Sequence, residues 1–377
     1  MVFNMKTIND FDFNEKRVIL RAELDVPLNN GKIISDNRLK ANIPTIKLLL
    51  EKGAKQILII GHLGRPEGIQ EDKSTKYLVE RFKELLGEDV LYAENFNVQL
   101  QEAKIVLFEN TRFFAGEKEN TEEFSKEIAN YGDVYVNNCF STSTRDHASL
   151  TGVAKLLPSF AGLRVVEELQ ALSITDKESP KVLMLGGAKM ETKLPVIKEM
   201  LDKVDKILLG SATVVILLKA KGLYSGKLLF DYDNYEDLKE VIDNPKIIYP
   251  IDFVCSKSKT AEDLTYKKFE EIKEDDFVMD LGPETTELYK KELTDAKTII
   301  WNGPFGLYEI KEYAKSSEEI AKFIANLNAF TLVGGGDTEE ILNATNTKDK
   351  INHICIGGGS MLKLLAGDKL PALEILN

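Results

Sequence analysis

Basic residues follow the strand-like segments in the first half of the chain. Each segment is a short apolar run, and the residues that come after these runs are His62, Arg65, Arg112 and Arg145. In open α/β sheets, ligands bind beyond the carboxyl ends of the parallel strands, so these residues are candidates for a binding site. Arginine suits such a site because its planar fork binds carboxylate or phosphate with two hydrogen bonds. The pattern therefore predicts a site for an anionic substrate.

Glycines follow the strand-like segments in the second half in the same way. The clusters are Gly186-Gly187, Gly303, Gly334-Gly335-Gly336 and Gly357-Gly358-Gly359. After the cluster at Gly334 we expect a helix that begins at Asp337. The free N–H groups and the positive dipole end of a helix attract phosphate, and glycine lets the phosphate approach the backbone closely. The second half is therefore expected to bind a nucleotide, and two anionic ligands together favour phosphoryl transfer.

Three charged residues near these glycines allow two interpretations each. Asp337 is either the cap of its helix or a ligand for Mg²⁺ on the phosphates. Lys189 and Lys193 are four residues apart, so on a helix they would share one face. They form either a cation pair for a phosphoryl group or a solvated surface pair. Neither G-x-x-x-x-G-K-[ST] nor G-x-G-x-x-G occurs, which argues against a P-loop or a dinucleotide fold.

Length and charge narrow the class of protein. A chain of 377 residues is long enough for two or three domains. The formal net charge of -12 argues against nucleic acid and anionic membranes as partners. Apolar runs are too short to span a membrane, and residues 1–10 lack the pattern of a signal peptide, so we expect a cytoplasmic protein. The three cysteines are too scattered for a disulfide framework or a zinc site.

Helical and strand-like patterns alternate along the chain. Helices are expected near 39–50, 78–86, 121–131 and 194–203, and each comes before a strand-like run. This order indicates βαβ units and therefore an α/β fold with parallel sheets and right-handed crossovers. A further helical pattern begins at Pro158 and is followed by the polar stretch 175–180. We interpret it as a hinge helix between two lobes, with an ordinary surface helix as the alternative.

The ordered motifs resemble those of the phosphoglycerate kinase family over the whole chain. The N-terminal matches are Val26-Pro27-Leu28 with Arg38, Gly61-His62-Leu63-Gly64-Arg65-Pro66, Glu109-Asn110-Thr111-Arg112-Phe113 and Arg145-Asp146-His147-Ala148-Ser149. The C-terminal matches are Leu185-Gly186-Gly187-Ala188-Lys189, Trp301-Asn302-Gly303-Pro304 and Gly334-Gly335-Gly336-Asp337-Thr338.

The resemblance implies a fold, a reaction and a separate ligand for each lobe. The fold would be two Rossmann-like lobes, each a parallel sheet flanked by helices, joined by the hinge helix. Residues 1–158 with the tail 363–377 would bind phosphoglycerate, and residues 159–362 would bind the nucleotide. The reaction would be reversible phosphoryl transfer between 1,3-bisphosphoglycerate and Mg-ADP, giving 3-phosphoglycerate and ATP in glycolysis. We expect a monomer that uses Mg²⁺, with ATP or ADP as co-substrate.

The resemblance also assigns roles to individual residues. The predicted catalytic residues are Arg38, Lys189 and Lys193. The predicted phosphoglycerate-binding residues are Glu23, Asp25, Arg38, His62, Arg65, Arg112 and Arg145. The predicted nucleotide-binding residues are Lys189, Lys193, Asn302, Pro304, Glu309, Gly334, Gly335, Gly336, Asp337 and Thr338. Asp337 is the predicted metal ligand. His147 is interpreted as structural.

Several positions depart from the family pattern. The usual Asp-Phe-Asn before Val-Pro is Glu23-Leu24-Asp25, which puts a carboxylate where the family has a neutral amide. Thr144 replaces a histidine, Asp146 adjoins Arg145, and Ser211 replaces a glycine near the expected adenine site. Three interpretations follow: an active phosphoglycerate kinase, a kinase of the same fold for another carboxylate or acyl phosphate, or a non-catalytic relative that binds a nucleotide or a protein.

Overall fold

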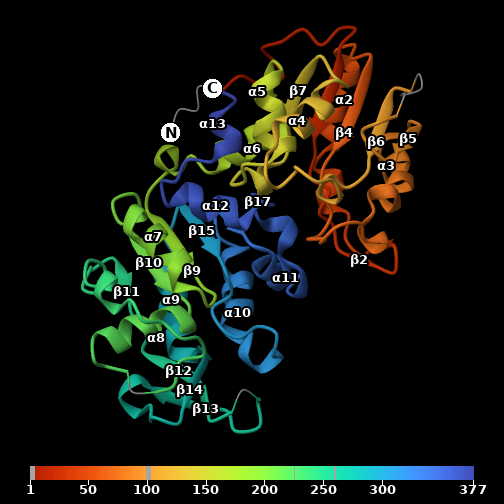
Figure 1. Ribbon diagram of the computed structural model, residues 1–377. Coiled ribbons are helices and arrows are strands. Elements are labelled where there is room, and N and C mark those ends of the chain that lie inside the picture. The colour runs from red at the N-terminus through yellow and green to blue at the C-terminus, as the bar shows by residue number, and fades with distance from the viewer. Residues whose placement is uncertain (1–4, 99–102, 225, 259) are drawn as a thin grey trace. The chain divides into compact units, whose positions relative to one another are not determined.

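The computed structural model describes residues 5–98, 103–224, 226–258 and 260–377 (Figure 1). The chain divides into two compact units. The N-terminal unit contains residues 1–170 and 369–377, and the C-terminal unit contains residues 171–368. Residues 1–4, which belong to the segment in which we expected no signal peptide, lie outside the described part. Within that part, every helix is too short or too polar to cross a bilayer.

The N-terminal unit is built on a parallel sheet of six strands in the order β5-β6-β4-β1-β7-β8. The strands are β1 (Arg17–Arg21), β4 (Gln56–Ile60), β5 (Val90–Ala93), β6 (Ile105–Phe108), β7 (Val134–Asn137) and β8 (Ser159–Ala161). A two-stranded hairpin, β2 (Leu28–Asn29) with β3 (Lys32–Ile33), precedes the first helix. The helices are α1 (Asn37–Lys40), α2 (Ile43–Glu51), α3 (Val79–Leu86), α4 (Glu122–Ala129), α5 (Val153–Leu156), α6 (Leu163–Ala171) and α13 (Pro371–Glu374).

Alternate strand residues of this sheet enter two different cores. Val18 and Leu20 of β1 pack in one cluster with Ile46 of α2, whereas Ile19 packs in the other with Phe124 and Ile128 of α4. Successive side chains of a strand point to opposite faces, so helices are needed on both sides of the sheet. The core residues in the strands are almost wholly buried, which fixes the positions of the loops that follow them.

Two helix predictions in this unit are wrong. The single helix expected near 39–50 is divided into α1 and α2. Pro44 has no N–H to continue the helix, and its ring would clash with the carbonyl of Lys40. The helix expected to begin at Pro158 starts only at Leu163, because Ser159–Ala161 extends as the edge strand β8 beside β7. There the pairing with β7 overrides the helical spacing of the apolar residues.

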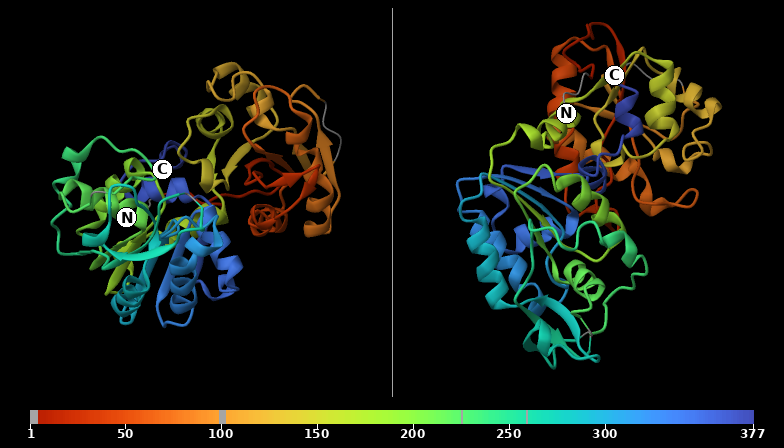
Figure 2. Two further views of the ribbon diagram at one scale, coloured as in Figure 1. Left: turned by 90° about the horizontal axis from the view of Figure 1, so that it is seen from below. Right: turned by 90° about the vertical axis from the view of Figure 1, so that its left-hand side faces the viewer.

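The C-terminal unit is built on a second parallel sheet, in the order β11-β10-β9-β15-β16-β17. Its strands are β9 (Lys181–Leu185), β10 (Lys206–Leu209), β11 (Ile247–Ile248), β15 (Thr298–Asn302), β16 (Phe330–Gly334) and β17 (His353–Cys355). The helices are α7 (Met190–Met200), α8 (Ser211–Ala220), α9 (Pro283–Leu293), α10 (Lys315–Ile324), α11 (Gly336–Ala344) and α12 (Gly358–Leu365). Helices α10 and α11 pack side by side along this sheet (Figure 2).

A small antiparallel sheet in the C-terminal unit was not anticipated. It has the order β13-β12-β14 and consists of β12 (Asp252–Ser256), β13 (Thr265–Lys268) and β14 (Phe277–Leu281). The largely buried helix α8 packs against β14, which explains why its residues 214–218 are all apolar. The prediction of an α/β fold with two lobes, each a parallel sheet flanked by helices, is confirmed.

Candidate active site

The basic residues of the N-terminal unit lie at the carboxyl ends of neighbouring strands. β6, β4, β1 and β7 are adjacent in the sheet, so residues that are distant in the sequence meet at one edge. Arg112 follows β6, His62 and Arg65 follow β4, Arg21 ends β1, and Arg145 follows β7. The order of these strands in the sheet differs from their order along the chain, so the sequence alone does not show which of these residues lie side by side.

Arg21 is a basic residue that the sequence analysis missed. Its side chain is buried, with 1% of the residue exposed. Nε donates to Ser149 Oγ at 3.0 Å, Nη1 donates to the Ala22 carbonyl at 2.8 Å, and Nη2 lies 3.1 Å from His62 Nδ1. The signal was present, because the segment RVILR is an apolar strand that ends in a cation. Applying the rule used for the other strands would have found Arg21.

His62 and the unusual Asp25 lie together next to Arg21. Burial and the guanidinium of Arg21 hold the pKa of His62 well below its usual value, so the ring is neutral at neutral pH. Since Arg21 donates to Nδ1, the hydrogen of His62 is placed on Nε2, which is 3.7 Å from Asp25 Oδ2. Asp25 Oδ1 accepts a hydrogen bond of 2.8 Å from the backbone N–H of Gly64. The Asp25 carboxylate is therefore held by the loop after β4, and the neutral His62 lies beside it without a hydrogen bond to it.

The unusual Glu23 supports Arg38. Its carboxylate is fully buried and accepts from the Ser141 backbone N–H at 2.8 Å and from Ser141 Oγ at 2.6 Å. Arg38 Nη1 lies 3.3 Å from Glu23 Oε2. Asn42, at the break between α1 and α2, binds the backbone N–H and carbonyl of Glu23. Glu23 thus has no face open to a ligand and instead orients Arg38, which is only partly buried.

Arg112 offers a donor that the protein leaves unused. Its Nη1 donates to the Gly64 carbonyl at 2.6 Å, whereas its buried Nε has no hydrogen-bond partner among the described residues. Burial, and then the charges of Arg21 and Arg145, lower the pKa of Arg112. Three guanidinium groups therefore lie within each other's fields. A cluster of like charges with an unsatisfied donor is typical of a site that binds an anion.

His147 belongs to the same electrostatic environment. Burial and the charges of Arg112 and Arg21 lower its pKa, while Glu117, 3.8 Å away, opposes this effect. The acidic departure Asp146 points elsewhere in its loop, where its Oδ1 accepts hydrogen bonds from Asn120, at 2.7 Å, and from Thr151. Arg65 and Arg145 are exposed at the sheet edge. The N-terminal unit therefore gathers several cations at this sheet edge, and the carboxylates of Asp25 and Glu117 offset part of their charge.

The glycine turns of the C-terminal unit pack against one another. A Cβ on Gly186, after β9, would lie 1.9 Å from the carbonyl oxygen of Pro304 after β15, so no larger residue fits. Gly335 has a φ of 100°, which disfavours residues with a Cβ, and it caps α11. The helix begins at Gly336, one residue earlier than predicted. Its first N–H groups therefore follow a turn that only glycine makes without strain, as an anion site requires.

Asn302 links Lys193 to this turn. Its Oδ1 accepts a hydrogen bond of 2.6 Å from Lys193 Nζ, and its Nδ2 donates to the Gly334 carbonyl at 2.9 Å. Lys193 is 5% exposed, and burial lowers its pKa to about 8 although the charge of Asp337 acts in the opposite direction. The buried Thr338 accepts from the Gly303 N–H at 2.8 Å and donates to the Gly334 carbonyl. Asn302 and Thr338 thus hold the turns and the lysine in place.

Lys189 does not share a helix face with Lys193. α7 begins only at Met190, so Lys189 is the residue before the helix and is exposed. The expectation of a paired helical face is wrong because the turn at Gly187, with a φ of 80°, delays the first helical residue. The two lysines therefore differ in environment, one buried and hydrogen-bonded and the other solvated.

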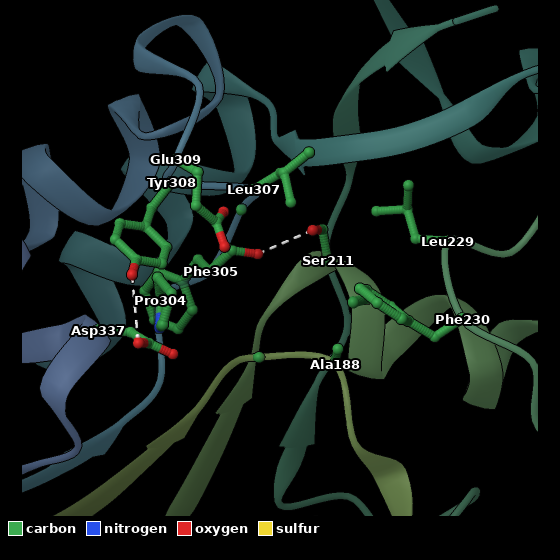
Figure 3. A pocket seen from close by; sticks show the side chains of 13 residues that line it. Ala188, Ser211, Leu229, Phe230, Pro304, Phe305, Leu307, Tyr308, Glu309 and Asp337 are labelled. Carbon is green, nitrogen blue, oxygen red and sulfur yellow. Dashed lines mark hydrogen bonds between the residues drawn. The ribbon is translucent and has the colours of Figure 1, made fainter. Parts of the chain in front are cut away.

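A pocket opens at these turns (Figure 3). Of the predicted nucleotide residues, Pro304, Glu309 and Asp337 line it. The full lining consists of Gly187, Ala188, Ser211, Ala212, Leu229, Phe230, residues 304–309 and Asp337. Leu229 and Phe230 were missed because they lie outside regular structure and outside any recognised motif. Phe230 is 47% exposed and gives the pocket an aromatic wall.

Two side-chain contacts shape this pocket. Ser211 Oγ donates to the Phe305 carbonyl at 2.8 Å, so the hydroxyl that replaces the family glycine is satisfied within the protein (Figure 3). The Tyr308 hydroxyl donates to Asp337 Oδ1 at 3.2 Å (Figure 3). Burial and the Asp337 carboxylate raise the pKa of Tyr308, so its phenol stays protonated and remains a donor.

The carboxylate of Asp337 fits a phosphate-bound Mg²⁺. It is exposed in the first turn of α11, next to the proposed phosphate position. In the described part of the chain, no group of three or more His, Cys, Asp or Glu residues could hold a metal by itself. Mg²⁺ commonly uses one or two carboxylates, phosphate oxygens and water, so a single aspartate is sufficient here.

Cations and glycine turns at the carboxyl ends of parallel sheets are typical of α/β enzymes that act on phosphate-bearing ligands. Comparison with known proteins specifies the enzyme. The sequence profile described as phosphoglycerate kinase matches residues 8–368. The chain is 38% identical to the phosphoglycerate kinase of Clostridium kluyveri, with 100% of both chains covered. It is 36% identical to that of Finegoldia magna, with 99% of each chain covered.

Solved structures agree with the sequence comparison. Phosphoglycerate kinase from Coxiella burnetii superposes with a TM-score of 0.88 at 32% identity and covers 99% of this chain and 98% of its own. The enzyme from Pyrococcus horikoshii gives a TM-score of 0.81 at the same identity and coverage. This chain therefore belongs to the phosphoglycerate kinase family. It is a kinase with a carboxyl group as acceptor, its role is in glycolysis, and ATP and ADP are the co-substrates of the family.

Proposed function

We propose that the N-terminal unit binds phosphoglycerate and that this chain is an active enzyme despite its acidic departures. The observation that carries the proposal is the group of Arg21, Arg112 and Arg145 at the sheet edge, in which the buried Nε of Arg112 has no hydrogen-bond partner among the described residues. The Asp25 carboxylate accepts a hydrogen bond from the Gly64 N–H, and the Asp146 carboxylate accepts hydrogen bonds from Asn120 and Thr151. Because these contacts engage the carboxylates of Asp25 and Asp146, the Nε of Arg112 and the exposed Arg145 stay available to the substrate.

The C-terminal unit is assigned to the nucleotide. The adenine and ribose would occupy the pocket between Phe230 and Pro304, and the phosphates would reach the turn at Gly335. Asp337 would hold Mg²⁺, which would neutralise phosphate charge when bound. Lys193, anchored by Asn302, would place its ammonium at the moving phosphoryl group, and Lys189 would add a solvated cation.

The chemistry needs no strong base. A carboxylate oxygen of 3-phosphoglycerate is already a nucleophile, and it forms a new O–P bond to the terminal phosphorus of ATP while the bond from that phosphorus to ADP breaks. Charge accumulates on the equatorial oxygens, where Lys193 and Arg38 would stabilise it. In the reverse direction, the acyl phosphate transfers its phosphoryl group to ADP. We further propose that the enzyme acts as a monomer in the cytoplasm.

A coupled assay with Mg-ATP and 3-phosphoglycerate tests the function, and calorimetry tests the site. We expect turnover, and we expect Asp337→Ala to weaken ADP binding in Mg²⁺ while leaving metal-free ADP binding almost unchanged. Absence of turnover with this substrate, but turnover with another carboxylate, would assign the fold to a different acceptor. No turnover with any carboxylate would favour a binding protein. Equal losses of affinity with and without Mg²⁺ would mean that Asp337 is not the metal ligand; Gly335, and not Asp337, is the cap residue of α11.

A further inference from the structure

Tyr308 joins two segments that the nucleotide site brings together. It lies in the turn after β15, whereas its partner Asp337 lies in the first turn of α11 after β16. The phenol donates to only one carboxylate oxygen, Oδ1, at 3.2 Å, and both residues line the same pocket (Figure 3). Oδ2 of Asp337 has no such bond to Tyr308 and is available to a ligand.

The position of Tyr308 is fixed by its own loop. The N–H of Leu307 donates to the carbonyl of Met279 at 2.9 Å, and the N–H of Phe305 donates to Ser317 Oγ at 2.8 Å. These bonds attach two positions just before the tyrosine to β14 and to α10. A partner held in this way can set the orientation of a ligating carboxylate, as hydrogen-bond partners behind metal ligands do.

The number of free carboxylate oxygens affects which metal binds. Mg²⁺ is small, requires near-octahedral geometry and is bound through single oxygens, whereas Ca²⁺ accepts more oxygens and often takes both from one carboxylate. A hydrogen bond that occupies Oδ1 discourages two-oxygen binding by Asp337. It also restricts rotation of the carboxylate, which would otherwise be free on the exposed helix turn.

We propose that Tyr308 is a positioning residue that holds Asp337 for one-oxygen coordination and so favours Mg²⁺-nucleotide over the Ca²⁺ complex. The inference rests on the proposed role of Asp337 as the metal ligand. It assigns to Tyr308 a task that the phosphate-binding turn cannot perform, because backbone N–H groups attract phosphate and not metal.

The test is calorimetric titration of the full chain with ADP alone, with Mg-ADP and with Ca-ADP. Tyr308→Phe removes only the hydroxyl. We expect it to weaken Mg-ADP binding about tenfold, the lower end of losses seen for outer partners of metal ligands. Binding of metal-free ADP should not change, and the preference for Mg-ADP over Ca-ADP should fall. Tyr266→Phe, the same change at a tyrosine 55% exposed on β13, is the matched control and should behave as the unchanged protein.

The two variants distinguish the metal-ligand role of Asp337 from the positioning role of Tyr308. If Asp337→Ala leaves the Mg²⁺ dependence intact, Asp337 is not the metal ligand and the proposed site fails. If Asp337→Ala abolishes that dependence but Tyr308→Phe keeps the affinity and metal preference of the unchanged protein, the site stands and the inference about Tyr308 is refuted. Tighter Mg-ADP binding by Tyr308→Phe would also refute it, since the phenol would then compete with the metal. Equal melting temperatures would exclude misfolding as the cause.

Discussion

The buried ammonium of Lys193 predicts that the protein takes up a proton when it binds ATP. Burial lowers its pKa to about 8 in the ligand-free protein, so about half of the lysines are neutral at pH 8 and about nine tenths at pH 9. A phosphate charge about 4 Å away at an effective dielectric of about 20 contributes about 4 kcal/mol. At 1.36 kcal/mol per pH unit, this attraction raises the pKa by about 3, to about 11. The bound enzyme would then be fully protonated at pH 9.

The expected uptake grows with pH. It is about 0.1 proton per ATP at pH 7, about 0.5 at pH 8 and about 0.9 at pH 9. Protons are taken up, and not released, because the ATP phosphate stabilises the charged form of Lys193 that burial disfavours. The dissociation constant for ATP should also rise by about tenfold per pH unit above pH 8. Calorimetry in buffers with different ionisation enthalpies measures the uptake directly, and at pH 8 and above ATP carries no titrating proton of its own.

Two lysine variants make the experiment specific. Lys193→Arg keeps a cation that remains charged throughout this range, so its uptake should vanish and its ATP affinity should be flat with pH. Lys189→Arg makes the same change at the exposed lysine and should retain the uptake of the unchanged protein. An undiminished uptake in Lys193→Arg, or none in the unchanged protein at pH 9, would refute the reasoning.

Three further outcomes follow from the same contacts. Lys193→Met should abolish activity and raise the free energy of unfolding at pH 7 by about 1 to 3 kcal/mol, because it removes a buried charge. The pKa of Lys193 is lower in the folded protein than in the unfolded chain, so the unchanged protein gains stability as the pH rises from 8 towards 10.5. Urea titrations should therefore show that the advantage of Lys193→Met shrinks over this pH range. Asp25→Asn should lower the KM for 3-phosphoglycerate about threefold with little change for ATP, since Asp25 is partly screened by water; a higher KM would indicate adaptation to another substrate. Glu23→Gln should raise that KM about tenfold by loosening Arg38, and steady-state kinetics with unchanged ATP parameters would distinguish this from global misfolding.

Residues with a local physical signature could be predicted from the sequence. Apolar runs followed by cations or glycines mark the ends of parallel strands, and β4, β6, β7, β9, β15 and β16 follow that rule. The antiparallel sheet escaped because β13 consists of TYKK, a short and mostly exposed strand without an apolar face of its own. Its existence depends on pairing with β12, which is a non-local property.

The environment of a side chain was harder to predict than its place. Lys189 and Lys193 look equivalent in the sequence, yet a turn at Gly187 leaves one in water and folds the other against Asn302. Likewise, the sequence around Glu23 and Asp25 does not reveal their hydrogen-bond donors. Ser141 donates to the Glu23 carboxylate, and the Gly64 N–H donates to the Asp25 carboxylate. Partners of this kind come from loops after different strands, so only the assembled sheet reveals them.

The return of the chain to its first unit affects the order in which the units are completed during synthesis. The C-terminal unit is continuous, whereas the N-terminal unit also contains residues 369–377. There the backbone N–H of Lys6 donates to the Leu376 carbonyl at 3.1 Å, Asn137 Nδ2 donates to the Ala372 carbonyl, and Leu373 and Leu376 are buried. The unit that is made first is therefore finished last, in contrast to the usual order of folding from the N-terminus. A nascent chain would acquire the full set of contacts within the N-terminal unit only after residues 369–377 have been made, so this unit cannot complete its packing before the whole C-terminal unit has been synthesised.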